Sequence, residues 1–360
     1  MKTVLVVEFN NFHAEIFPIY PTHCAALLGC DEDELSCVYA VSPKRYSTNV
    51  QPSNVQWHRL ESSWSRWWAS KLGIRRWYYG LITKKLLKRF QPDLVVFNTI
   101  ESRAGRFLSA LKACESHKTI IVVHSPFSHT YQLVKRSDNQ EYFCLNHYNY
   151  QYLKRQSYPI DGYFMCAFPF IEGQRVRKTS AIQIAVLGKV EYERRDYNEL
   201  IHILLAAKKQ QVNNMEFIIV ADKTSDEAIH LLDSMKKHDL MRYTVTFDKR
   251  PTDQEFAQAV IDCDYILPLL AEGSDYMNGK ISGSIVHSGA YRKPMILKHA
   301  VRRHLNLSDN CCVGYDDADE LIDTLLNSSI DEMKGSYASY INKQMIDCLF
   351  FLKNSRRDKE

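Results

Sequence analysis

Short apolar runs alternate with longer stretches of helical periodicity along almost the whole chain. Runs of this length between amphipathic segments are typical of parallel strands joined by crossover helices. The runs are TVLVVEF, LSCVYAV, VQWHR, DLVVFN and TIIVVH in the first half, and IQIAVLG, EFIIVA, YTVTFD, DYILPLL, KPMILK and CCVGY in the second. The alternation therefore predicts an α/β protein with two doubly wound sheets.

Domain organisation follows from the break between these two series of runs. The stretch IEGQRVRKTSA is polar, contains Gly173 and has no periodicity. We predict a Rossmann-like N-terminal domain over 1–172, a linker over 173–181, a second Rossmann-like domain over 182–330, and a helix with a frayed tail over 331–360. A chain of 360 residues agrees with two domains of roughly 100–200 residues each.

Composition excludes several classes of protein. No apolar run approaches the roughly 18 residues of a membrane-spanning helix, and Glu8 interrupts the apolar stretch at the N-terminus, which argues against a signal peptide. The ten cysteines form no CxxC pair, which indicates reduced thiols rather than a zinc site or a disulfide framework. The net charge of +4 argues against a duplex-binding protein that is basic over its whole surface. We expect a cytoplasmic protein that binds no nucleic acid.

The common phosphate and cofactor motifs do not occur. Thirteen glycines include no GxG pair, so the dinucleotide fingerprint is missing. The segment GSDYMNGKI has five residues between its glycines where a phosphate loop has four, and Ile281 replaces the Ser or Thr. The triplet Asp262-Cys263-Asp264 has the DxD form of some metal-binding transferases. Its position at a helix end and a strand start favours local structural roles, and no metal site is predicted.

A basic loop is expected after the first strand of the second domain. In LGKVEYERRDYNELIHILLAAKK the strand ends at Gly188 and a helix begins near Asp196, leaving Lys189, Arg194 and Arg195 between them. Ligands of doubly wound sheets bind at the carboxyl ends of the strands. Arginine offers paired donors to phosphate oxygens. The loop therefore indicates a diphosphate site, and a solvated basic loop is the alternative.

A second polar loop follows the run DYILPLL. Its candidate residues are Glu272, Asp275, Lys280, Ser282, Gly283 and Ser284. The small run at its end is expected to open a helix that continues through Tyr291. Backbone amides at such a helix start approach phosphate closely, and the helix dipole favours negative charge there. The alternative is that Ser282 only caps the helix.

These features together resemble the GT-B glycosyltransferases, particularly the GT4-like families. The similarity rests on two α/β domains, the basic loop, and the late loop and helix followed by YRKPMIL. It implies two Rossmann-like domains facing across a cleft, with a nucleotide sugar bound by the second domain and an acceptor by the first. It also implies that no cofactor or metal is required. The donor diphosphate would be held by Gly188 with Arg194 or Arg195, by Lys280 and by the turn 282–284.

The sequence departs from the GT4 pattern at two positions. Relatives carry two glutamates with seven residues between them, and the second one lies seven positions before the proline that corresponds to Pro294. Here Gly279 and His287 occupy these positions. The imidazole of His287 can still hydrogen-bond ribose hydroxyls, and Glu272 and Asp275 are candidates for contact with the donor sugar.

The acceptor side offers three candidate residues. His124 follows the buried run TIIVVH, where it can accept a proton from an attacking hydroxyl or bond the donor sugar. His13 and Glu15 follow the first strand. One of the three would act as base if transfer inverts the anomeric centre, whereas retention needs no such base, and Glu272 is a further catalytic candidate. A packing or capping role is the alternative for His124.

The segment 62–90 is basic and aromatic, with eight Lys or Arg, no acid and four of the five tryptophans. A basic helix with interfacial aromatics is typical of a membrane surface element. The residues expected to face lipid are Trp64, Trp67, Trp68, Arg75, Arg76, Trp77, Lys84 and Lys85. The alternatives are a crossover helix that packs its aromatics inward and a nucleic-acid surface.

The combined prediction is a metal-independent, hexosyltransferase-type glycosyltransferase on the inner face of the cytoplasmic membrane. It would extend a lipid-linked glycan acceptor in surface polysaccharide biosynthesis, using a nucleotide-sugar donor as co-substrate. The departing diphosphate would be stabilised by cations already in place. A nucleotide-sugar epimerase of similar build and a non-catalytic scaffold are the alternatives.

Overall fold

A computed structural model gives the structure of the chain, which divides into two compact units. The first contains Met1–Cys166 and Met345–Glu360, and the second Ala167–Gln344. The structure describes residues 1–9, 14–41, 55–60, 75–99, 104–124, 137–165, 173–176, 179–309 and 312–357. The stretch 173–181, expected as a linker, is thus assigned to the second unit, and the C-terminal helix is shared between the two.

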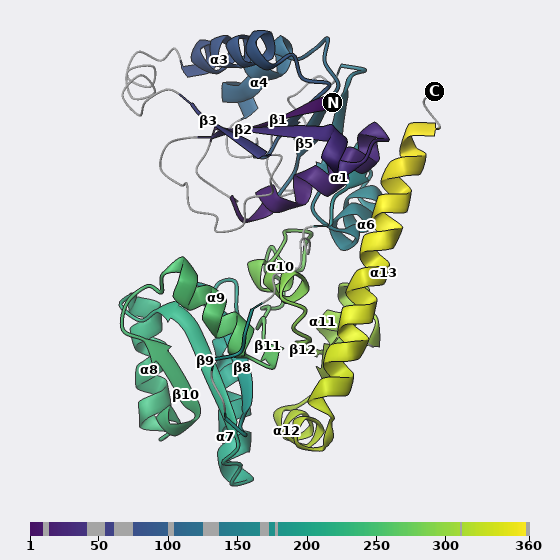
Figure 1. The fold of residues 1–360 in the computed structure, drawn as a ribbon. Coiled ribbons are helices and arrows are strands. Elements are labelled where there is room, and N and C mark those ends of the chain that lie inside the picture. Colours follow the sequence, from purple (N-terminus) through teal and green to yellow (C-terminus); the bar gives the residue numbers. More distant parts are fainter. Residues whose placement is uncertain are drawn as a thin grey trace. The chain divides into compact units, whose positions relative to one another are not determined.

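The first unit is built on a seven-stranded parallel sheet (Figure 1). Its strands are β1 (Lys2–Glu8), β2 (Leu35–Val41), β3 (Val55–Arg59), β4 (Leu94–Phe97), β5 (Thr119–Val122), β6 (Gln140–Cys144) and β7 (Gly162–Tyr163), in the order β3-β2-β1-β4-β5-β6-β7. Its helices are the 3-10 turns η1 (Ala14–Ile19) and η2 (Glu32–Glu34) and the α-helices α1 (Tyr20–Leu28), α3 (Arg75–Phe90), α4 (Ala104–Ala113) and α6 (His147–Arg155). The five predicted strands are confirmed; β6 and β7 were not predicted.

The second unit has a six-stranded parallel sheet in the order β10-β9-β8-β11-β12-β13. Its strands are β8 (Ile182–Leu187), β9 (Met215–Asp222), β10 (Thr244–Phe247), β11 (Tyr265–Ile266), β12 (Met295–Lys298) and β13 (Cys312–Tyr315). Its helices are α7 (Tyr197–Lys209), α8 (Asp226–Lys237), η3 (Met241–Tyr243), α9 (Asp253–Asp262), α10 (Gly283–Ala290), α11 (His299–His304) and α12 (Ala318–Asn327). All six predicted strands are present, so the predicted α/β class with two parallel sheets is confirmed.

Strand order reverses once in each sheet. The chain runs outward from β1 through β2 to β3 and returns to β4, which pairs with β1. In the second sheet it runs from β8 through β9 to β10 and returns to β11, which pairs with β8. Crevices form at such switch points beyond the carboxyl ends of the strands. The segments after β1 and β4, and those after β8 and β11, are therefore the places to look for function.

The second sheet is buried on both faces, as its apolar strands require. Ile184 and Val186 of β8 pack in a core with helices α7 and α12, while Ala185 and Leu187 pack in another with α9 and α10. Successive side chains of a strand point to opposite faces. A continuous apolar run such as IQIAVL is the result.

The last helix, α13 (Ile330–Arg357), begins earlier and ends later than expected. In the second unit its Lys334 bonds Asp264 at 2.8 Å, and its Tyr337 hydroxyl lies 2.5 Å from Ser288 Oγ. In the first unit its Phe351 stacks on Tyr163 with 5.2 Å between ring centroids. The helix includes the first residues of the expected tail, as far as Arg357. Within the described residues, no helix is both long and apolar enough to cross a membrane.

Candidate functional site

Gly188 and Arg195 meet at the switch point of the second sheet. Gly188 directly follows β8 and has a φ of +94°, a conformation that favours glycine. A Cβ at this position would lie 2.9 Å from Nη2 of Arg195, so the missing side chain makes room for the guanidinium. Arg195 is only 7% exposed. The loop after β8 is closed by Asp196, which caps α7 as predicted by accepting a hydrogen bond from the Glu199 amide.

The start of α10 reaches the same point. Arg195 Nη1 donates to Ser284 Oγ at 3.1 Å and to the Pro268 carbonyl at 3.4 Å. Ser282 is the N-cap residue, yet its side chain makes no cap hydrogen bond, and its Oγ is buried with no partner among the described residues. Ser282 therefore occupies the N-cap position that the alternative gave it, but its side chain does not cap the helix. Gly283 is exposed, and a Cβ there would meet nothing within 4 Å.

The other two cations of the basic loop share one carboxylate, that of Glu191. Lys189 Nζ lies 3.2 Å from Glu191 Oε1, and Arg194 Nη1 lies 3.1 Å from Glu191 Oε2. Both side chains are largely exposed, at 63% and 41%. Of the two arginines that the sequence left open, Arg195 is the one brought to Gly188 and Ser284.

The loop before α10 contains the remaining donor candidates. Lys280 Nζ pairs with Asp275 Oδ2 at 3.5 Å, and Glu272 is exposed. Gly279 has a φ of +93°, a backbone conformation in which a glutamate would be strained. His287 lies against Phe256 of α9, with 4.8 Å between ring centroids.

A cavity of about 260 Å³ lies beside this loop, on the carboxyl side of β11, β12 and β13. Its polar lining includes Asp196, Glu199, Glu272, Lys298 and Tyr315. Lys298 Nζ lies 2.9 Å from Glu199 Oε2. Burial, together with the neighbouring Glu199 carboxylate, raises the pKa of the Tyr315 hydroxyl well above its usual value, so this phenol stays protonated. Of these five, only Glu272 was a sequence candidate for chemistry.

A different kind of cluster occupies the switch point of the first sheet. Glu8 ends β1 and is 3% exposed; its Oε2 accepts hydrogen bonds of 2.7 Å from Asn98 Nδ2 and Thr99 Oγ1. The hydroxyl of Tyr20 donates to Asn98 Oδ1. His124 is 4% exposed, and its Nε2 lies 2.6 Å from the backbone carbonyl oxygen of Asn98. A carbonyl only accepts, so Nε2 carries the hydrogen and the lone pair of the neutral ring is on Nδ1.

Several solved glycosyltransferase structures align with this chain over nearly the full length of both proteins. A glycosyltransferase from Rickettsia africae aligns with a TM-score of 0.61 and 12% identity, over 99% of this chain and 97% of the other. The trehalose-6-phosphate structure from E. coli, bound with UDP-2-fluoro glucose, aligns at 0.57 and 10% identity, over 99% and 98%. The lipopolysaccharide outer core galactosyltransferase aligns at 0.56 and 12% identity, over 100% of both chains.

The chain has the GT-B fold. No family model matches its sequence, and no curated protein does. At 12% identity or less these likenesses establish the architecture, so the GT4-like subdivision stays a prediction. Within the GT-B fold, Gly188, Arg195, Ser282, Gly283 and Ser284 are the predicted donor residues that the structure brings together.

Helix α3 forms the second part of the segment 62–90 that was predicted to face the membrane, and it has one buried and one exposed face. Tyr79, Ile82, Leu86 and Leu87 are buried, whereas Trp77 is 73% exposed. Among the residues of α3 whose side chains are described, the other exposed ones are Leu81, at 61%, and Lys84, Lys85, Lys88 and Arg89. The inward-packing alternative is thus correct for one face, while the opposite face presents an indole, a leucine and four cations.

Several predicted residues lie outside the described part of the chain. His13 and the tryptophans Trp64, Trp67 and Trp68 are among them, and so are the side chains of Glu15, Arg75 and Arg76. Glu15 itself belongs to η1. Their roles stay predictions.

The Asp262-Cys263-Asp264 triplet of this GT-B chain has structural roles. Asp264 is 2% exposed and bonds the Gln183 amide at 3.0 Å, with Arg175 and Lys334 completing its ion pairs. Asp262 accepts from the Val176 amide at 2.8 Å. Both carboxylates therefore hold the start of the second unit against β11 and α13, as the local interpretation expected.

Proposed function

We propose that this protein transfers a sugar from a nucleoside diphosphate sugar to an acceptor hydroxyl. The convergence of Gly188, Arg195 and Ser284 at the switch point of the second sheet carries this proposal. A GT-B relative of the same architecture was solved with UDP-2-fluoro glucose bound. Because Arg195 is the cation that reaches the start of α10, the donor's diphosphate would bind there.

The site suits a diphosphate in three ways. The first amides of α10 have no partners within the helix, and the helix dipole favours an anion at this end. Ser282 has a buried hydroxyl with no partner among the described residues. The exposed α-carbon of Gly283 leaves space for phosphate oxygens to approach the backbone. Together with Arg195, these groups would stabilise negative charge on the departing β-phosphate.

The acceptor chemistry would belong to the first unit. The acceptor oxygen forms a bond to the anomeric carbon as the bond from that carbon to the β-phosphate oxygen breaks. The hydroxyl proton passes to Nδ1 of His124 if the anomeric configuration is inverted, or to the departing phosphate if it is retained. Glu8 and Asn98 hold the His124 ring in the tautomer that can accept this proton.

A lipid-linked acceptor is supported by the exposed face of α3. Trp77 and Leu81 lie one turn apart on that face, and Lys84, Lys85 and Lys88 follow. Indole rings favour the headgroup layer, and cations near an anionic surface contribute about 1 kcal/mol each. We therefore propose peripheral attachment to the inner face of the cytoplasmic membrane and a role in extending surface glycans.

The proposal is tested with a panel of UDP-, GDP-, ADP- and dTDP-sugars, measured by thermal shift and then by isothermal titration. We expect one nucleotide to raise the melting temperature and its sugar to be transferred or slowly hydrolysed, releasing the nucleoside diphosphate. Absence of binding by every nucleotide would overturn the proposal. Binding with interconversion of sugar epimers, in place of transfer, would favour the epimerase alternative.

A further inference from the structure

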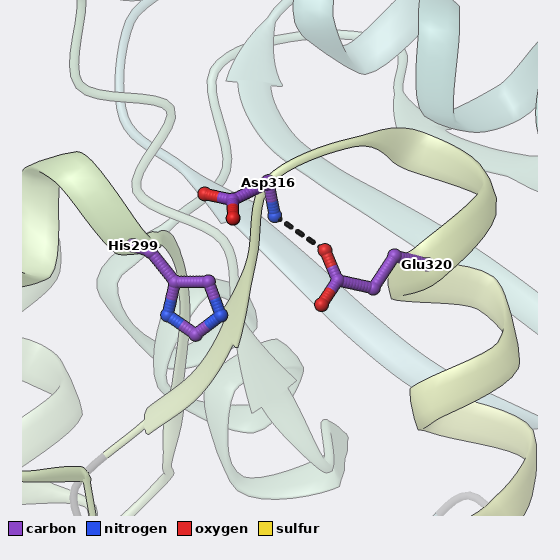
Figure 2. A group of neighbouring side chains, drawn as sticks. All are labelled: His299, Asp316 and Glu320. Atoms are coloured by element: carbon purple, nitrogen blue, oxygen red, sulfur yellow. Dashed lines mark hydrogen bonds between the residues drawn. The ribbon is translucent and has the colours of Figure 1, made fainter.

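Three potential metal ligands converge beside β12 and β13, at the β13 edge of the second sheet. His299 directly follows β12, Asp316 directly follows β13, and Glu320 lies in the first turn of α12. Figure 2 shows the imidazole and the two carboxylates approaching from these three elements. One ligand atom from each lies within 4.8 Å of the other two. The proposed donor residues follow β8 and β11, so this triad is not part of the diphosphate site.

Strand register and helix capping hold the triad in place. Lys298 of β12 is paired with Tyr315 of β13, so His299 and Asp316 leave the sheet at the same level. Glu320 Oε2 accepts the Asp316 amide at 2.7 Å, the bond drawn in Figure 2, and this leaves its Oε1 for another ligand. Asp317 caps α12 by accepting from the Glu320 amide at 2.9 Å. These bonds hold the Glu320 carboxylate in place, and the strand register places Asp316 beside His299.

A glycine admits the imidazole. A Cβ at position 314 of β13 would lie 2.4 Å from Cε1 of His299 and 2.5 Å from its Nδ1, so any larger residue would displace the ring. Of the two ring nitrogens, Nε2 is the one that Figure 2 shows turned toward Asp316 and Glu320, while Nδ1 points away from them. The imidazole therefore offers Nε2 to the site.

The ligand set selects a class of ion. One imidazole nitrogen and two carboxylates suit borderline divalent ions such as Zn²⁺ and Mn²⁺, whereas Mg²⁺ and Ca²⁺ prefer oxygen alone. A tetrahedral ion with bonds of about 2.1 Å holds its ligands about 3.4 Å apart. The ligand atoms here lie within 4.8 Å of one another, and rotation of the exposed Asp316 side chain can bring them to the shorter separation. Three protein ligands leave a position open for water.

We propose that His299, Asp316 and Glu320 bind one divalent transition-metal ion. The ion ties the end of β12 to the loop after β13 and to α12, and it neutralises two carboxylates that otherwise repel each other. The site is independent of the proposed glycosyl transfer, because none of its ligands belongs to the donor or acceptor residues.

The test is metal binding by the full-length chain after treatment with a chelator. Mn²⁺ is counted by electron paramagnetic resonance and Zn²⁺ by isothermal titration, with Mg²⁺ as the comparison ion. We expect one Mn²⁺ or Zn²⁺ per chain, and at least tenfold weaker binding by Asp316→Asn and by Glu320→Gln. Both changes keep side-chain shape, and the glutamine still offers an oxygen to the Asp316 amide.

The matched control is Asp319→Asn, which removes a carboxylate from the same helical turn. Asp319 is half exposed and pairs with Lys209 at 3.0 Å. We expect its metal binding to equal that of the wild type. The proposal is overturned if the wild type binds neither ion, if Mg²⁺ binds equally well, or if Asp319→Asn weakens binding as much as Asp316→Asn does.

Discussion

The two sheets have the same topology and opposite chemistry at their switch points. In the first, Glu8 lies in a closed network with Asn98 and Thr99. In the second, Arg195 meets the start of α10, where Gly283 faces open space. The strand order determines where a ligand can reach each sheet, and the side chains determine which ligand it is. In the proposed function, the second sheet binds the anion and the first binds the acceptor hydroxyl.

The largest effect is expected when the cation of the second switch point is removed. Arg195→Met takes away charge-assisted hydrogen bonds to phosphate, so UDP or the nucleotide selected by the panel should bind with a loss of about 3 kcal/mol, about 100-fold. Arg194→Met is the matched control, because Arg194 is already paired with Glu191. Its affinity should stay within about threefold of the wild type. Equal losses in both variants would show that the loop acts only through its net charge.

The first unit should also carry a pH dependence that comes from His23. This residue is fully buried, its Nδ1 lies 2.7 Å from the Ile19 carbonyl, and its Nε2 accepts the Met165 amide. Burial lowers its pKa to about 4. In the unfolded chain the His23 imidazole has a pKa near 6.5, so between pH 6.5 and pH 4 the unfolded chain binds more protons than the folded one. The contribution of His23 to the free energy of unfolding is therefore complete above pH 6.5 and decreases as the pH drops toward 4. Between pH 7 and pH 5 the free energy of unfolding should decrease by about 2 kcal/mol from this group.

Tryptophan fluorescence measures this effect, because all five tryptophans lie between residues 57 and 77, in the first unit. Urea unfolding at pH 7 and pH 5 should show a smaller difference for His23→Gln than for the wild type, since glutamine keeps a donor and an acceptor but does not titrate. A pH dependence identical in both proteins would mean that His23 is not the group responsible.

Glu8→Gln is expected to separate the two switch points functionally. The change removes the negative charge beneath Asn98 and disturbs the support of His124, so the transfer rate should fall about tenfold, or about 1.4 kcal/mol. Nucleotide affinity should not change, because Glu8 belongs to the other unit. A loss of affinity without a loss of rate would contradict the division of roles between the sheets.

The smallest effect is expected on the surface of α3. Trp77→Ala with Leu81→Ala should weaken sedimentation with vesicles containing anionic lipid about fivefold, or about 1 kcal/mol, and the binding should weaken further in salt. Ile229→Ala on α8, an apolar residue of the second unit with 46% exposure, is the control and should not change it. If all three proteins sediment alike, α3 is not the membrane surface.

The sequence was sufficient for most of the strands and for three candidate residues that the structure brings together. Eleven strands were recognised because apolar runs are local, and Gly188, Arg195 and Ser284 because they follow strands whose ends meet in space. Strand β6 begins with Gln140 and Glu141, and β7 has two residues, so neither shows an apolar run.

Contacts between distant residues were the part that could not be predicted. Glu8 and Asn98 are 90 positions apart, and Glu8 was read only as an interruption in an apolar strand. The pairing of both Lys189 and Arg194 with Glu191 is local in sequence, but it depends on the conformation of the loop. The pairing of Glu199 with Lys298 joins positions about a hundred residues apart. Charge counts along the chain therefore identify candidates, and the fold decides which charges remain available.

The most direct test of the diphosphate site compares two glycines that both have open space around them. Gly283→Ala adds a methyl group at the start of α10, and Gly335→Ala adds one on the exposed surface of α13. Isothermal titration with the nucleotide should show about tenfold weaker binding for Gly283→Ala, because phosphate can no longer approach the backbone, and unchanged binding for Gly335→Ala. If both variants bind the nucleotide as the wild type does, the diphosphate does not bind at α10.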